Sequence, residues 1–350
     1  MPTPDDALIR RKDEHIDHVR AGRGLSGASS GLEAVRFVHD ALPDLALDQI
    51  DLSARFLGRR LNLPFLISSM TGGPSRAEAI NARLAEAAQA LGVALAVGSQ
   101  RVALETAGGS GGSGLGPDLR RLAPDALILA NLGAVQFALG YGADEARRAM
   151  EMIGADALIL HLNPLQEGVQ PEGDRDWRGV AQGIERIAAA FPGQVVVKET
   201  GAGLSAAVAR RLADMGVAAL DVAGAGGTNW GLIEGARATG GRAEALAAPF
   251  ADWGVPTARS LRDCAQAAPD LGLIGSGGIK DGLDAARAVR LGADLVGQAA
   301  GVLEAALTST QAVVDHFELM AAQLRLACFC TGSADLAALA QAPLLEEPRF

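Results

Sequence analysis

A run of polar side chains follows an apolar stretch in the segment HLNPLQEGVQPEGDRDW, which spans residues 161–177. It begins with His161 and Asn163 and continues with the amide Gln166 and the carboxylate Glu167. Mg2+ in proteins prefers one or two carboxylates and completes its shell with substrate phosphates, so Glu167 is the predicted metal ligand. Gln166 is predicted to position substrate or to relay a proton. Three further carboxylates follow, and read alone they would indicate a solvated acidic loop: Glu172, Asp174 and Asp176.

Lys198 ends the apolar run VVVK, so its charge should emerge at the end of a buried strand. A structural lysine lies more often on an exposed helix surface. At a strand end, the cation could stabilise negative charge on a reduced flavin ring. Small hydrogen-bonding groups end other runs and suit the edge of such a ring, although each alone could cap a helix: Thr71, Ser99, Asn131 and Thr228.

Two turns of small residues, SGGIK at 276–280 and GQAAG at 297–301, have the composition of a phosphate site. Glycine lets the backbone approach an anion closely, and main-chain N–H groups at a helix start can then face that anion. In barrels of alternating strands and helices, phosphate sites commonly follow the last two strands. The predicted phosphate contacts are Gly277, Gly278, Ile279, Lys280, Ala299 and Ala300.

Cations that could hold a diphosphate occur in two places. Arg101 lies in the segment GSQR, while Arg11, Lys12 and His15 lie near the N-terminus in RRKDEHIDH. The N-terminal cluster could equally be a solvated arm, because a run of charges is usually a surface feature.

The elements that must hold these residues are eight short runs rich in Val, Ile, Leu and Ala. Such runs are typical of buried parallel strands, and Ala-rich segments with helical spacing fit between most of them. Eight alternations favour a closed (β/α)8 TIM barrel, of the α/β class, over an open doubly wound sheet. Polar side chains at the carboxyl ends of the strands would then meet in one bowl. The predicted strands are 64–70, 93–98, 126–131, 157–163, 195–200, 217–224, 271–278 and 293–299.

The chain of 350 residues is predicted to be one domain. Residues 61–301 form the barrel, preceded by an N-terminal arm (1–60) and followed by a helical tail (302–350). Two Gly/Ser-rich stretches, at 21–31 and 107–116, are expected to be mobile loops or linkers.

Composition limits the partners and the compartment. The net charge of -10, without a long basic run, argues against binding of nucleic acid. Cys264, Cys328 and Cys330 have no metal-site spacing and give no disulfide framework, which favours a reducing compartment. The N-terminus is polar from its start, and no apolar run approaches the roughly 18 residues of a membrane span. We therefore expect a cytoplasmic protein without membrane association that acts on small molecules.

Nine segments, taken together and in order, resemble the type 2 isopentenyl diphosphate isomerases: RKDEH, SMTGG, GSQR, NLGAVQ, HLNPLQEGVQPEGDRDW, KETGAGLS, DVAGAGGTNW, GVPT and SGGIKDG. The resemblance implies an FMN barrel that needs reduced FMN and Mg2+, uses NADPH or NADH to reduce the flavin, and interconverts isopentenyl and dimethylallyl diphosphate. Protons would be added and removed mainly through N5 of the reduced flavin, with no net redox change in the substrate. The family also implies a homo-tetramer or homo-octamer.

The resemblance assigns roles to residues that match the family's motifs. The catalytic residues would be His161 and Gln166, and Glu167 would hold Mg2+. The implied FMN contacts are Ser69, Met70, Thr71, Ser99, Asn131, Lys198, Thr228 and the two phosphate turns. The implied substrate contacts are Arg11, Lys12, His15, Ser99, Gln100, Arg101, His161, Asn163 and Gln166.

Two positions depart from the family's pattern. Ala223 stands in DVAGAGG where many relatives carry a serine, and GQAAGVL lacks the proline usual after the second phosphate turn. Contacts made there by the backbone should survive, whereas contacts made by those side chains are in doubt.

Three other functions compete with the isomerase. An FMN-dependent 2-hydroxy-acid oxidase, the main alternative, requires a histidine base at the end of the sixth barrel strand, where VAGAGGTN has none. A nucleotide dehydrogenase of the IMP type needs a nucleophilic cysteine in a rim loop, and no rim motif contains one. A flavin-storing or scaffold protein would leave the grouped carboxylates, amides and cations unexplained.

Overall fold

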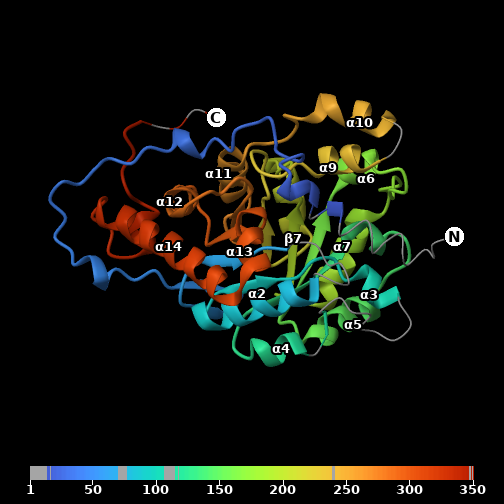
Figure 1. Ribbon diagram of the computed structural model, residues 1–350, viewed down its shortest axis with the longest axis horizontal. Coiled ribbons are helices and arrows are strands. Elements are labelled where there is room, and N and C mark those ends of the chain that lie inside the picture. Colours follow the sequence, from blue (N-terminus) through green and yellow to red (C-terminus); the bar gives the residue numbers. More distant parts are fainter. Residues whose placement is uncertain are drawn as a thin grey trace.

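The fold is a closed barrel of eight parallel strands in which β10 pairs back onto β3. The computed structural model describes residues 14–15, 17–69, 77–105, 115–116, 118–238, 241–346, 348 and 350. Helices surround the strands on all sides (Figure 1), so the predicted TIM barrel is confirmed. The barrel strands are β3 (Phe65–Ile67), β4 (Ala94–Ala96), β5 (Ile128–Gly133), β6 (Ala157–Leu162), β7 (Val195–Glu199), β8 (Ala219–Asp221), β9 (Gly272–Ser276) and β10 (Leu295–Gln298).

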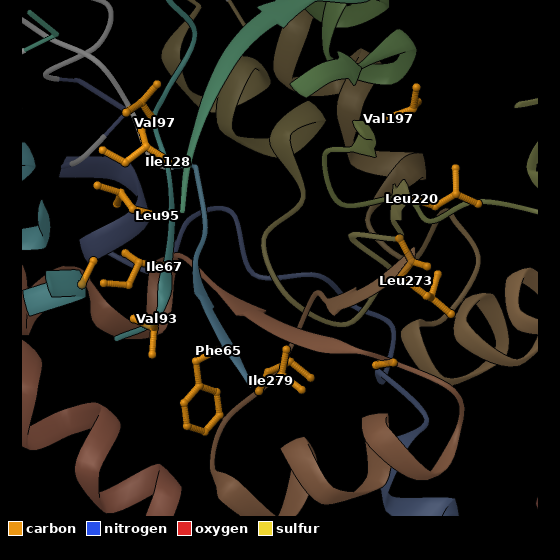
Figure 2. Close-up of a cluster of buried hydrophobic side chains, with 14 of the residues drawn as sticks. Phe65, Ile67, Val93, Leu95, Val97, Ile128, Val197, Leu220, Leu273 and Ile279 are labelled. Carbon is orange, nitrogen blue, oxygen red and sulfur yellow. The ribbon is translucent and has the colours of Figure 1, made fainter. Parts of the chain in front are cut away.

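Each strand falls on one of the eight predicted apolar runs, because both faces of a barrel strand are buried. Leu66 joins the cluster inside the barrel, whereas its neighbours Phe65 and Ile67 join the cluster between strands and helices. Figure 2 shows part of that outer cluster, with Phe65 and Ile67 beside side chains of the next strands. The ring of Phe65 lies 5.5 Å from the ring of Phe317 in the C-terminal tail.

A hairpin that was not predicted covers one end of the barrel interior. Its strands are β1 (Ala54–Phe56) and β2 (Arg59–Leu61), and Phe56 joins the interior cluster. A Cβ at Gly272 would lie 2.8 Å from the Phe56 ring, so glycine makes room for the ring. The turn is Leu57-Gly58 with both residues at positive φ, and leucine there lacks the Asn-Gly or Asp-Gly signature of such turns.

The helices between the strands largely match the Ala-rich segments, and further helices lie where none was predicted. Residues 164–169 were taken as part of a loop but form a helix with Pro164 at its first position, where proline is well tolerated. No helix among the described residues combines the length and apolar character needed to cross a bilayer. The inter-strand helices include α2 (Ala77–Leu91), α5 (Ala143–Ile153), α7 (Val180–Ala190), α8 (Ala206–Asp214), α11 (Thr257–Ala267) and α12 (Gly282–Arg290). The additional ones include α6 (Pro164–Val169), α9 (Trp230–Arg237) and α10 (Arg242–Ala247).

The tail is helical, as predicted, and begins directly after β10. It consists of η5 (Ala300–Val302), α13 (Leu303–Thr308), α14 (Thr310–Phe329) and α15 (Leu336–Leu339). Figure 1 shows α13 and α14 on one side of the barrel, near α2 and α12.

The Gly/Ser-rich stretch at 21–31 is tied to the barrel rim, contrary to the expected mobile loop. Ser26 N donates to Gly227 O at 2.8 Å, and Asn229 N donates to Gly24 O at 2.7 Å. Ala258 N further donates to Ser30 O at 2.9 Å. The glycines of this stretch therefore allow its backbone to approach the barrel loops closely, and they do not indicate a mobile loop. Most of the second stretch, at 107–116, lies outside the described residues.

Candidate active site

A cavity of about 350 Å3 lies where the carboxyl ends of all eight barrel strands meet. The N-terminal arm contributes His15, Val19 and Leu25 to its wall. Predicted site residues that line it are His15, Ser69, Ser99, Arg101, Asn131, His161, Asn163, Gln166, Glu167, Lys198, Thr228, Gly277, Gly278, Ile279, Ala299 and Ala300. Four predicted residues lie outside the described part of the chain: Arg11, Lys12, Met70 and Thr71.

Two predicted residues are not in the wall. Gln100 is fully buried, and its Nε2 donates to Ala149 O at 2.8 Å while its Oε1 accepts from Asn131 N at 2.9 Å. The side chain of Lys280 is exposed at the surface, and its backbone N donates to Asp284 Oδ2 at 3.2 Å. Gln100 therefore holds the backbone of Asn131 and does not line the cavity. We leave Gln100 and Lys280 out of the proposed ligand contacts.

The first phosphate turn is built from glycines that no other residue could replace without strain. Gly277 and Gly278 have φ of 103° and 70°, in the region that favours glycine. A Cβ at Gly277 would lie 2.3 Å from Gly224 O, and one at Gly278 would lie 2.5 Å from Gly226 O. The turn thus packs backbone against backbone on the loop after β8, with its atoms facing the cavity.

The loop after β8 also contains Ala223, the first departure from the family's pattern. Ala223 is buried with φ of 35°, an unusual conformation for a residue with a Cβ. Its backbone N donates to Asp221 Oδ1 at 3.3 Å, which helps to hold this conformation.

Lys198 reaches the cavity at the end of β7 and is paired with a carboxylate. Its Nζ lies 3.2 Å from Asp221 Oδ2, and the two side chains are 10% and 0% exposed. Asp221 Oδ1 also accepts from Ser276 Oγ at 2.6 Å, so one buried carboxylate joins the ends of β7, β8 and β9. Sequence reasoning missed Asp221, although a charged residue inside the apolar run VAALDVAG was an available signal.

The residue after Lys198 shapes the adjoining loop. Glu199 is buried, and its Oε2 accepts from the backbone N–H groups of Thr200, Gly201, Ala202 and Gly203. Burial raises the pKa of Glu199 to about 7, although these hydrogen bonds favour the ionised form and oppose the rise. The carboxylate fixes a loop whose residues Thr200 and Gly201 line the cavity.

Asn131 links three strand ends through its side-chain amide. Its Nδ2 donates to Ser69 Oγ at 2.9 Å, so its Oδ1 faces His161 Nδ1 at 2.7 Å. Since Oδ1 can only accept, Nδ1 of His161 carries the proton. Burial and then the nearby charge of Lys198 lower the pKa of His161 to about 4. His161 is therefore neutral at pH 7.

This pKa predicts acid sensitivity. In the unfolded chain His161 should titrate near pH 6.5, so between about pH 6.5 and 4 the unfolded state binds a proton that the folded state does not. The free energy of unfolding should therefore fall as pH is lowered through this window, by about 1 to 2 kcal/mol from pH 7 to 5. Urea denaturation of the wild type and of His161→Asn at both pH values measures it. An equal loss in the two proteins would refute the assignment to His161.

Helix α6 places three predicted residues on one face. Asn163 immediately precedes the helix. Gln166 and Glu167 come three and four residues after Asn163, a spacing of about one helical turn. Asn163 Nδ2 donates to Gln166 Oε1 at 3.2 Å and to Glu167 Oε1 at 2.8 Å. Asp174 N donates to Glu167 Oε2 at 2.7 Å. Both oxygens of the predicted metal ligand are thus oriented by neighbours.

A buried carboxylate that the sequence did not reveal orients Gln166. Glu234 Oε1 accepts from Gln166 Nε2 at 2.9 Å and lies 3.0 Å from His15 Nε2, and its Oε2 accepts from Arg237 Nε at 2.8 Å. Burial alone would raise the pKa of Glu234, but these partners outweigh burial and hold it at about 2. The ionised carboxylate therefore ties the N-terminal arm, through His15, to the amide of Gln166.

The three carboxylates beyond Glu167 each have a basic partner. Asp174 Oδ2 accepts from Arg101 Nη1 at 2.9 Å and from Gln136 Nε2 at 3.1 Å. Glu172 pairs with Arg237 at 3.2 Å, and Asp176 pairs with Arg178 at the surface. They shape the loop through ion pairs.

The residues present fit a bound FMN. The glycine turn presents its backbone to the cavity, and the buried cation of Lys198 faces the same cavity. For a metal, the described residues contain no cluster of three or more His, Cys, Asp or Glu side chains. Glu167 lines the cavity as a single carboxylate, and Mg2+ commonly takes one or two carboxylates together with the phosphates of a ligand.

Comparison with known proteins gives one family and one fold. Residues 167–346 match the model of the FMN-dependent dehydrogenases. The chain is 65% identical to a protein named isopentenyl-diphosphate delta-isomerase from Xanthobacter autotrophicus, over 96% of this chain and 97% of the relative. It is 63% identical to the protein of that name from Stutzerimonas stutzeri, over 97% and 98%. The protein of that name from Synechocystis is 48% identical, over 97% and 96%.

Solved structures of similar fold are much more distant in sequence. A mandelate oxidase superimposes with a TM-score of 0.63 at 19% identity, covering 98% of both chains. A lactate oxidase from Pediococcus acidilactici gives 0.65 at 20% identity, covering 99% of this chain and 95% of that one. At this identity the likeness supports the barrel alone.

Proposed function

This chain belongs to the isopentenyl-diphosphate delta-isomerase family, and on that basis we propose that it interconverts isopentenyl and dimethylallyl diphosphate with FMN and Mg2+. The observation that carries the proposal is that one cavity is lined by the two phosphate turns, by Gln166 and Glu167 of α6 and by Asn163, which precedes α6. A site for a flavin phosphate and a site for a metal-bound diphosphate are thus available in the same bowl.

The chain's own groups divide between cofactor and substrate. Backbone N–H groups of Gly277, Gly278 and Ile279, with those of Ala299 and Ala300, would hold the FMN phosphate. Lys198 would place its charge beside the flavin ring. Its ion pair with Asp221, at 3.2 Å, orients the lysine side chain. Small side chains that line the cavity would meet the ring and the ribityl chain: Ser69, Ser99, Asn131 and Thr228. The resemblance to the family adds Met70 and Thr71, which lie outside the described residues.

The opposite side of the cavity would hold the substrate. Arg101, His15 and Asn163, with Arg11 and Lys12, would bind the diphosphate, and Glu167 would complete the shell of its Mg2+. When bound, reduced FMN supplies an atom that can give and take a proton, so the substrate needs no redox change. Gln166, held at one end by Asn163 and at the other by Glu234, has the fixed orientation that a substrate-positioning amide needs. NADPH as the reductant and a homo-tetramer or homo-octamer are proposed from the family, whereas a cytoplasmic location is proposed from the cysteine usage.

The 2-hydroxy-acid oxidase remains the alternative because it shares the barrel. Such an enzyme needs a histidine base after β8, and residues 222–228 contain none. The proposal therefore predicts no peroxide from 2-hydroxy acids in air, and a peroxide assay separates the two functions.

The direct test is an anaerobic assay with isopentenyl diphosphate, FMN, Mg2+ and NADPH. We expect isomerisation only after the flavin has been reduced, because the proton-transfer role belongs to the reduced ring. Photoreduced FMN should replace NADPH, since the reductant serves only to reduce the flavin. Full turnover with oxidised FMN and no reductant would refute the acid/base mechanism.

A further inference from the structure

Helix α14 lies outside the barrel, packs on α12 and α2, and does not reach the cavity (Figure 1). Its residues His316, Met320 and Gln323 are spaced four and three apart, so they share one face of the helix. Each of the three contacts an element next to a phosphate turn. The proposed catalytic machinery includes none of them.

The first contact runs through Gln298, the last residue of β10. Gln298 is 5% exposed, and its Nε2 donates to Ile279 O at 3.0 Å, which joins the second phosphate turn to the first. Its Oε1 therefore faces His316 Nε2, which lies 2.5 Å away and must carry the proton of this hydrogen bond. His316 thus fixes the orientation of the amide that bridges the two turns.

The second contact lies at the start of α12, which follows the first phosphate turn. Gly282 N donates to Gln323 Oε1 at 2.8 Å. A Cβ at Gly282 would lie 2.1 Å from Met320 O, so only glycine allows α14 to come this close. The backbone of α12 is therefore held against α14 two residues after Lys280.

Together these contacts hold both phosphate turns against a single outer helix. We propose that His316 and Gln323 are positioning residues that set the spacing of the two phosphate turns and so tighten the grip on the phosphate of FMN. The inference rests on the proposed FMN site. It predicts that replacing His316 or Gln323 weakens binding of the FMN phosphate and leaves binding of the flavin ring unchanged.

Riboflavin, which lacks the phosphate, separates the two ends of the cofactor. We expect His316→Ala to raise the Kd of the apoprotein for FMN about tenfold, because Gln298 loses the donor to its buried oxygen. The Kd for riboflavin should stay within twofold of the wild type. Both constants are measured by quenching of flavin fluorescence during titration. Gln323→Ala should act in the same direction, and His316→Gln should recover part of the FMN affinity because its amide can donate to Gln298.

Leu319→Ala is the matched control, since Leu319 lies on α14 but is 61% exposed. It should leave both constants unchanged. Equal weakening of FMN and riboflavin in His316→Ala would overturn the proposal, because α14 would then only support the fold. An FMN Kd within twofold of the wild type would overturn it as well. If His316→Ala does not fold, the same comparison in Gln323→Ala decides. Absence of FMN binding by the wild type would instead refute the proposed function.

Discussion

Lys198→Met is expected to lower the free energy of unfolding by about 3 to 5 kcal/mol and to leave the purified protein without FMN. Lys198 Nζ lies 3.2 Å from Asp221 Oδ2, and both side chains are almost entirely buried. Methionine keeps the length of the side chain but removes the charge, so Asp221 becomes a buried carboxylate without its cation. Urea denaturation gives the stability, and the absorbance of the purified protein near the flavin bands gives the FMN content.

A double variant separates the two roles of Lys198. In Lys198→Met/Asp221→Asn the unpaired charge is gone, while the asparagine Oδ1 can still accept from Ser276 Oγ and from Ala223 N. Most of the lost stability should return, because breaking a buried pair costs more than replacing it. FMN affinity should not return. A double variant that regained full FMN binding would show that the cation has only a structural task.

The sequence was most informative where a chemical group lies at the end of an apolar run or shortly after it. Lys198, Glu167 and Gly277 each come after an apolar run, and a closed barrel brings the ends of all such runs together. Fold class, strand positions and 16 of the 34 residues that line the cavity could therefore be predicted without coordinates. Strand ends were predicted less well, because pairing with neighbours rather than the length of the apolar run decides where a strand stops.

Residues that act through a partner distant in sequence could not be predicted. Glu234 lies in WGLIEGAR, where a glutamate on a short helix would be taken as a solvated residue. It is buried where α9 packs on α6 and α10, and the packing on α6 brings it to Gln166, 68 positions earlier in the chain. His316 is similar, since nothing in the tail helix indicates that it faces Gln298. Tertiary packing, which no local pattern encodes, decided the role of both.

Glu167→Gln is expected to reduce activity on the order of 30- to 150-fold, the equivalent of roughly 2 to 3 kcal/mol for a lost charge-assisted ligand. The substitution keeps the volume but removes the one carboxylate proposed to meet Mg2+, so the metal would be held by the diphosphate alone. Diphosphate binding should weaken, and the rate should respond less to added Mg2+. FMN affinity should stay near that of the wild type, because the phosphate turns and Lys198 lie on other strands.

Asp176→Asn is the matched control for this prediction, because it removes a charge from the same loop at a surface site. Among the described residues, Asp176 pairs with Arg178, two residues away, and it does not line the cavity. Its pKa is lowered to about 2 by hydrogen bonds from Arg178, so the charge removed is fully present at neutral pH. Initial rates are measured over a Mg2+ titration for both variants and the wild type. Because Glu167 also accepts from Asp174 N, thermal unfolding of Glu167→Gln must be compared as well, to separate loss of the metal ligand from loosening of the loop. If Asp176→Asn loses its response to Mg2+ and Glu167→Gln keeps it, the metal ligand is not Glu167.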